Sequence, residues 1–147
     1  MSPSKHAAAS AAVSVAFAAY SHSAGGTLIC FLSGIFIDLD HVVDFWIAKR
    51  KPIFSYRKLY QYCANEKDGK LSLVLHSYEL HLLLWIAVFA LHLDVLWLGL
   101  AVGVTSHLIL DQIFNPLRPY VYFFAYRLKH GFDKKCIFPD EYYRTLQ

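Results

Sequence analysis

Apolar residues occupy long stretches of this chain, and charged residues fall mostly between those stretches rather than within them. Residues 6–37 contain no Asp, Glu, Lys or Arg, and residues 71–93 contain a single carboxylate, Glu79. The apolar pattern resumes after Asp94 and continues through Phe114. A helix that crosses a bilayer needs about 20 apolar residues. The pattern therefore predicts helices that are long enough to lie in a membrane.

Turn signals divide the N-terminal apolar stretch. Residues 6–37 are too many for one spanning helix, and the segment from Ser21 to Gly26, with two serines and a glycine pair, interrupts them near the middle. This predicts a hairpin of helices over residues 6–20 and 27–47. A cleaved signal peptide ending near Ser23 is the alternative, but the apolar run resumes directly after that point, which favours the hairpin.

A second predicted hairpin covers residues 71–93 and 95–114. Asp94 lies between these stretches and is expected to cap the N-terminus of the last helix. Asn115-Pro116 is a helix stop signal. The predicted fold is therefore all-α, a polytopic membrane bundle of about four transmembrane helices in two hairpins.

The composition agrees with a membrane location. The chain has 147 residues, of which 56% are hydrophobic, and its mean hydropathy is +0.36. A soluble domain of this size has too large a surface for its volume to bury so much apolar area. The net charge of +3 is too small to indicate nucleic-acid binding, and no such partner is expected.

Basic residues set the predicted orientation. They occur at Lys5, within residues 49–70 and within residues 118–144, and none occurs in residues 71–117. Because positive residues are retained on the cytoplasmic side, both termini and the basic loop 49–70 are predicted to be cytoplasmic. We expect a transmembrane domain over residues 1–118 and an interfacial or cytoplasmic tail over 119–147. Residues 55–64 are a candidate interfacial helix.

Ionisable residues within or beside the predicted spans are the main functional signal, because an ionised carboxylate at the centre of a spanning helix costs roughly 2.5–3.5 kcal/mol. No lysine or arginine within the spans could neutralise these carboxylates, whereas a bound divalent cation could. The candidate metal ligands are His6, Asp38, Asp40, His41, His76, His107 and Asp111. Glu79 is the candidate catalytic base.

Helical spacing groups several of these residues. His107 and Asp111 are four residues apart and share a helix face, which Gly99 and Gly103 extend. Two glycines on one face permit another helix to approach closely. In the predicted topology the ligand-bearing ends of the helices all lie on the cytoplasmic side, so we expect one shared site.

Other polar residues have simpler interpretations. His22, His92 and His130 are expected to be hydrogen-bonded packing residues, and the same interpretation is favoured for His81. Asp44 is interpreted as an interfacial residue near Lys49. The three cysteines (Cys30, Cys63 and Cys136) are odd in number and far apart, and therefore predict neither a disulfide framework nor a thiolate metal site.

Three short blocks resemble the membrane-bound metal-dependent hydrolase family of prokaryotic inner-membrane proteins. The sequence Phe-Ile-Asp-Leu-Asp-His at 36–41 resembles the family's Pro-Asp-x-Asp-His motif. Leu-His-Ser at 75–77 resembles its Thr-His-Ser, and Ser-His-Leu-Ile-Leu-Asp at 106–111 resembles its Ser-His-Leu-x-x-Asp. The early His6 fits as well. The chain departs from the family at Ile37, where proline is usual, and at residues 71–73, where a His-Arg pair is absent.

This resemblance implies a metal-dependent hydrolase of the phosphoesterase type. The carboxylate and imidazole donors favour Zn²⁺, with Mn²⁺ or Fe as alternatives. A site at the headgroup boundary beside basic loops suggests a lipid-like or phosphorylated substrate. Two other functions remain open at this point. The same residues could carry ions or protons across the membrane, or they could form a non-catalytic scaffold held by a metal or a polar cluster. The oligomeric state is not specified by the sequence.

Overall fold

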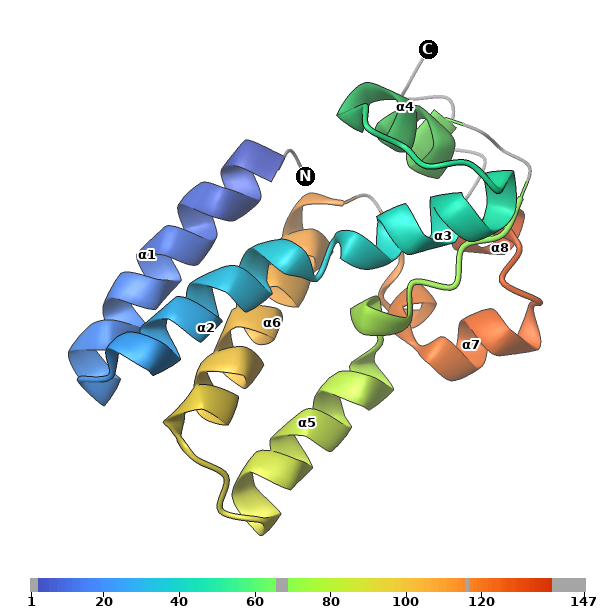
Figure 1. Cartoon of the computed structure of the whole chain (residues 1–147). Coiled ribbons are helices and arrows are strands. Elements are labelled where there is room, and N and C mark those ends of the chain that lie inside the picture. The colour runs from blue at the N-terminus through green and yellow to red at the C-terminus, as the bar shows by residue number, and fades with distance from the viewer. Residues whose placement is uncertain (1–2, 66–68, 116, 139–147) are drawn as a thin grey trace. The chain divides into compact units, whose positions relative to one another are not determined.

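The computed structural model describes residues 3–65, 69–115 and 117–138, which form helices and the turns and loops that connect them (Figure 1). The predicted all-α class is confirmed, and the described residues contain only one isolated antiparallel bridge, between Lys70 and Asp133. The chain divides into two compact units. Unit 1 comprises residues 1–37 and 79–115, and unit 2 comprises residues 38–78 and 116–147. The predicted division into residues 1–118 and 119–147 differs from this one, because residues 38–78 group with the tail.

Unit 1 is built around three packed helices, α1 (Pro3–Ser21), α2 (Ala24–Phe36) and α6 (Val95–Phe114). The turn between α1 and α2 lies at His22, whose φ is 50°, and at Ser23, whose side chain accepts a hydrogen bond from the Gly26 amide at 3.1 Å. The predicted hairpin is therefore present. The serine cap, rather than the glycine pair, makes the turn, and the glycines belong to the first turn of α2.

Glycines allow α2 and α6 to approach closely. A Cβ added at Gly103 would overlap the Ser33 hydroxyl and the Cys30 carbonyl, and one added at Gly99 would overlap the Gly26 carbonyl. The Ser33 hydroxyl also reaches the Leu100 carbonyl of α6 at 3.3 Å. The predicted role of the glycine stripe on α6 is confirmed.

The second hairpin joins α5 (Tyr78–Ala90) to α6. Asp94 caps α6 as predicted, since its carboxylate accepts hydrogen bonds from the amides of Leu96 at 3.0 Å and Trp97 at 3.4 Å. The bounds of α6 agree with the predicted helix over residues 95–114. Pro116, the predicted stop, lies outside the described residues.

Unit 2 consists of short helices around a small core. Its elements are α3 (Leu39–Lys49), α4 (Tyr56–Tyr60), the π-helical turn η1 (Gln61–Asn65), the 3₁₀ turns η2 (Val74–His76) and η3 (Pro119–Tyr122), α7 (Phe124–Lys129) and α8 (Lys134–Ile137). Tyr62, Leu71 and Tyr122 are buried in this core together with Arg127 and Lys134. The helical segment expected within residues 55–64 is present as α4 and η1. Residues 139–147 of the predicted tail lie outside the described residues.

Two predicted helices have different bounds in the structure. The helix expected over residues 27–47 is interrupted at Ile37 and Asp38, so that α2 and α3 are separate. The interruption places Asp40 in the first turn of α3, where the helix dipole favours a carboxylate. The helix expected over residues 71–93 begins only at Tyr78, because Leu73 has a left-handed backbone with φ 44° and Ser77 has an extended one. The amides of Ser72, Leu73 and Leu75 donate to carboxylates of α3.

Of the described helices, α6 alone is long and apolar enough to cross a membrane, and its apolar window is one-third buried. α5 is apolar but has 13 residues, and α2 also has 13, which gives each a length of about 20 Å. α1 has 19 residues but is rich in alanine and serine. The described structure is therefore helical and contains one helix, α6, that is compatible with a membrane span by length and composition.

Candidate functional site

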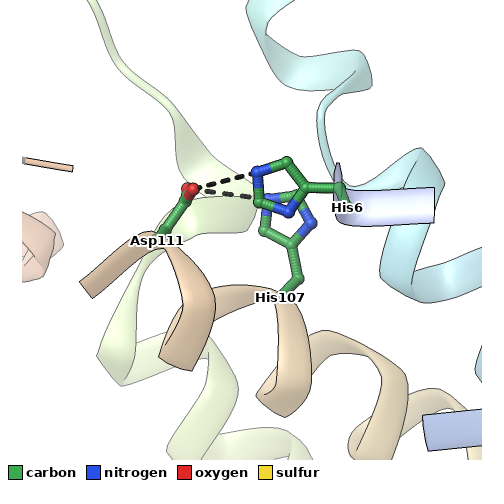
Figure 2. A group of neighbouring side chains, drawn as sticks. All are labelled: His6, His107 and Asp111. Carbon is green, nitrogen blue, oxygen red and sulfur yellow. Dashed lines mark ion pairs between the residues drawn. The ribbon is translucent and has the colours of Figure 1, made fainter. Parts of the chain in front are cut away.

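Unit 1 brings three of the predicted ligands together at one point, which we call the His6 cluster: His6, His107 and Asp111 (Figure 2). His6 Nε2 lies 3.2 Å from Asp111 Oδ1, and His107 Nε2 lies 3.5 Å from Asp111 Oδ2. The two imidazole rings stack with their centroids 4.0 Å apart. All three side chains are buried, and His107 has no exposed surface.

The hydrogen bonds of the His6 cluster leave an arrangement that could hold a cation. His107 Nδ1 lies 2.8 Å from the Gly34 carbonyl, so this nitrogen carries a proton and donates it. In neutral His107 the Nε2 atom therefore carries a lone pair and no proton. This lone pair and the Asp111 carboxylate, both hydrogen-bond acceptors, face each other at 3.5 Å. A proton or a metal ion between them removes this repulsion, and a ring held through Nδ1 in this way is the usual arrangement of a metal-binding histidine.

Unit 2 contains a second group, which we call the His76 cluster: Asp38, Asp40, His41 and His76. His76 Nδ1 donates to Asp40 Oδ2 at 3.0 Å, and His76 Nε2 lies 3.4 Å from Asp38 Oδ1. His41 Nε2 lies 3.7 Å from the same Asp38 oxygen. One ligand atom each from Asp40, His41 and His76 lies within 4.8 Å of the others, close enough to hold one ion.

Burial and charge oppose each other at His76. Burial of the ring lowers its pKa, but hydrogen bonds to Asp38 and Asp40 outweigh burial and raise the pKa of His76 to about 10. For Asp40, burial raises the pKa, yet the hydrogen bond to His76 prevails and the pKa lies below its ordinary value. Without a metal, the pair is therefore an imidazolium and a carboxylate at neutral pH. Asp40 Oδ1 is buried and has no hydrogen-bond partner among the described residues.

Cys63 lies beside the His76 cluster, although no sequence pattern pointed to it. Its Sγ is 3.5 Å from His41 Nδ1. Burial raises the pKa of the Cys63 thiol to about 12, so the thiol is protonated at neutral pH and can donate to the His41 ring. Cys63 belongs to the π-helical turn η1, a conformation that often occurs at functional sites.

The segment that carries His76 is held from two sides. On one side, α3 supplies Asp44, whose carboxylate accepts hydrogen bonds from the Ser72 amide at 2.7 Å, the Leu73 amide at 2.9 Å and the Ser72 hydroxyl. On the other side, the buried Arg127 of α7 donates to the Leu73 carbonyl at 3.0 Å and the His76 carbonyl at 3.3 Å. Asp44 is therefore a buried side chain whose carboxylate accepts hydrogen bonds from backbone amides. This corrects its interpretation as an interfacial residue.

Two further predicted residues take other positions. Glu79 is half-buried in the first turn of α5 and belongs to neither cluster. The His81 ring lies 3.0 Å from the Thr105 hydroxyl, and its Nε2 accepts a hydrogen bond from the Trp85 indole at 3.1 Å. This supports the interpretation of His81 as a packing residue. His130 likewise donates to the Tyr126 carbonyl at 2.8 Å.

All seven predicted metal ligands therefore lie in one of the two clusters, three in unit 1 and four in unit 2. The single shared site stays a prediction, because each cluster belongs to its own unit. Sequence reasoning missed Cys63 and Arg127. Arg127 carried one weak signal, an isolated arginine in an aromatic, apolar segment of the tail.

Comparisons of the chain with protein-family models, with curated proteins and with solved structures give no match. The chemistry of the site must therefore be argued from its residues. Both clusters combine imidazole nitrogens with carboxylate oxygens, and both could hold a metal ion. Such a mixed nitrogen and oxygen donor set is one that Zn²⁺, Mn²⁺ and Fe accept.

Proposed function

We propose that this protein is a membrane-associated, metal-dependent hydrolase that acts on a phosphoester or a similar ester at the headgroup interface. The observation that carries the proposal is the convergence of His6 and His107 on Asp111, with the His107 ring fixed through Nδ1 so that its Nε2 faces the carboxylate. Zn²⁺ is the preferred ion, and Mn²⁺ or Fe are alternatives.

The buried donor atoms fit a cation. Asp40 Oδ1 and His6 Nδ1 are buried and have no hydrogen-bond partner among the described residues, and Asp38 and Asp111 each face more than one imidazole nitrogen. A divalent cation bound by such a set supplies Lewis-acid chemistry to ester hydrolysis. The chain's own contribution is to bury the ligands and to fix their rings through the Gly34 carbonyl and the Asp40 carboxylate.

The membrane part of the proposal is insertion into the bilayer with both termini in the cytoplasm. The apolar stretches, the distribution of basic residues and α6, the one described helix long and apolar enough to cross a membrane, support it. Exposed apolar side chains on unit 1 agree with contact to lipid; they include Leu82, Leu83, Ile86 and Phe89 of α5 and Ile109, Ile113 and Phe114 of α6.

The proposal is tested by measuring metal content and ester hydrolysis on detergent-purified protein. Wild type is expected to retain Zn²⁺ and to hydrolyse a chromogenic phosphoester, and His107→Ala and Asp111→Ala are expected to lose both. His92→Asn is the matched control, because His92 is an exposed histidine with φ 50° that asparagine can adopt. Absence of metal from folded wild type, with both alanine variants unchanged, would overturn the proposal.

A non-catalytic scaffold is the second candidate, and one observation favours it. Asp40 and Asp44 both accept hydrogen bonds from backbone amides and thereby hold the segment from Ser72 to His76 in place. If metal is bound but no ester is hydrolysed, while removal of the metal unfolds the protein, the cluster is structural.

A further inference from the structure

Helix α3 presents an apolar stripe outward. Leu39, Val43, Trp46 and Ile47 follow the spacing of one helix face, and all four are exposed, Trp46 by 61% and Ile47 by 67%. Asp40 and Asp44, on another side of the same helix, are buried. The helix thus turns its carboxylates inward and its apolar residues outward, the reverse of a helix on the surface of a soluble domain.

Basic and aromatic residues continue this surface beyond the end of α3. Residues 45–65 contain five basic side chains and no acidic one. The five are exposed: Lys49, Arg50, Lys51, Arg57 and Lys58. Phe54, between the two basic groups, is 95% exposed. An apolar helix face with tryptophan, followed by lysine and arginine, is the pattern of a helix that lies in the interface plane of a bilayer.

From this arrangement we infer that α3 and the segment 49–58 form a surface that docks into the headgroup region of a bilayer and prefers anionic lipids. α3 has 11 residues and a length of about 16 Å, too short to cross a hydrocarbon core of about 30 Å. It therefore lies along the membrane surface rather than across it. The apolar stripe enters the acyl boundary and the five cations contact anionic headgroups.

This inference rests on the membrane association in the proposed function but not on hydrolysis. The surface also serves the proposed activity, because the other side of α3 carries Asp40 and His41 of the His76 cluster. A helix anchored by one side to anionic headgroups holds those two ligands at the depth of a lipid phosphate. The substrate class that this placement favours is an anionic lipid or a lipid-linked phosphate, with the ester bond at the headgroup level.

The test uses the full chain in proteoliposomes, with Trp85→Phe and Trp97→Phe so that Trp46 is the one remaining tryptophan. Trp46 fluorescence is measured in vesicles in which brominated phosphatidylglycerol or brominated phosphatidylcholine is present at equal mole fraction. Trp46 is expected to be quenched by both lipids and more strongly by the anionic one, and the difference is expected to shrink as salt is added.

Charge variants test the lipid preference. Removing three cations with Lys51→Gln, Arg57→Gln and Lys58→Gln is expected to abolish the preference, since each basic residue near the surface contributes roughly fivefold to the attraction of an anionic membrane. The matched control, Lys70→Gln with Lys129→Gln, removes exposed cations elsewhere in unit 2 and is expected to retain it. Circular dichroism of each variant confirms that it is folded.

Three outcomes would overturn the inference. Quenching of Trp46 by aqueous iodide but by neither lipid means that the stripe faces water. Protection from both lipid and iodide means that a second copy or another protein covers α3. Equal quenching by the two lipids, unaffected by the charge variants, means that there is no anionic preference. Metal content is measured on the same samples, so that failure of the docking surface is distinguished from failure of the metal site.

Discussion

Arg127 holds the backbone that carries His76, and its role is visible only in the folded chain. Its guanidinium donates to the carbonyls of Leu73 and His76, the residue before a short 3₁₀ turn and the residue that ends it. Residues 73 and 127 are far apart in the sequence, so neither local pattern nor spacing relates them. The sequence identified the candidate metal ligands by their chemical type but could not identify the residue that holds the backbone of one of them.

Replacement of Arg127 by methionine is expected to weaken metal binding as well as stability. Methionine fills the space but removes one donor from each of the two carbonyls. The Leu73 carbonyl keeps the His76 amide as a donor, and a buried acceptor left unsatisfied costs about 1–3 kcal/mol. Loss of a partner outside the ligand shell typically lowers metal affinity 10–100-fold. Zn²⁺ titration and thermal unfolding measure the two effects. Lys129→Met, an exposed substitution on the same helix, is the control and is expected to change neither.

Metal affinity is expected to increase with pH. The pKa of His76 is raised to about 10, so at neutral pH the metal-free ring carries a proton that an incoming cation must displace. Below that pKa, each pH unit is expected to strengthen binding by up to about tenfold for the one proton released. Zn²⁺ titrations between pH 6 and pH 8 measure this dependence. A pH-independent affinity would show that His76 is not a ligand.

At the scale of the elements, a helix start could be predicted where a capping residue lies next to it in the sequence. It could not be predicted where the preceding segment is held by side chains distant in the sequence. Asp94 begins α6 by accepting hydrogen bonds from amides two and three residues ahead, and its role follows from its position before the apolar run. The segment before α5 is held instead by Asp40 and Asp44 of α3, whose carboxylates accept hydrogen bonds from the amides of residues 72, 73 and 75. Only tertiary structure brings those groups together.

The close packing of α2 on α6 is expected to make Gly103 intolerant of a side chain. Gly103→Ala would push a methyl group against the Cys30 carbonyl, and overpacking of this kind typically costs about 1–3 kcal/mol. Gly25→Ala is the matched control, because the nearest atom to its added Cβ is the end of the flexible Leu96 side chain at 3.0 Å. Chemical denaturation should show a lower free energy of unfolding for Gly103→Ala alone.

At the scale of the whole molecule, the proposed membrane location rests on the composition and on α6. We expect the protein to remain in the membrane fraction after alkaline carbonate extraction, because α6 can span a bilayer and the exposed faces of α5 and α6 are apolar. The measurement is immunodetection of the full chain in pellet and supernatant. Release into the supernatant would contradict membrane insertion and leave only peripheral association.

The sequence by itself determined the helical class, the α6 helix with its cap, and the identity of the seven candidate ligands. These follow from local properties, namely the length of apolar runs, helix-capping chemistry and the cost of an unpaired carboxylate in an apolar segment. The sequence also placed the glycine stripe correctly, because a fixed spacing on one helix face is a local property.

Tertiary structure alone decided which ligands belong together, where α3 separates from α2, and which residues hold His76. The segment that carries His76 is held by carboxylates and an arginine that bind backbone groups tens of residues away. The His6 cluster joins two imidazoles and a carboxylate from two helices. Such pairings depend on the packing of whole helices, because a buried polar group takes whichever partner the fold brings within hydrogen-bond distance. The apolar residues of α3 look like part of a spanning helix in the sequence, and their exposure beside buried aspartates is apparent only in the fold.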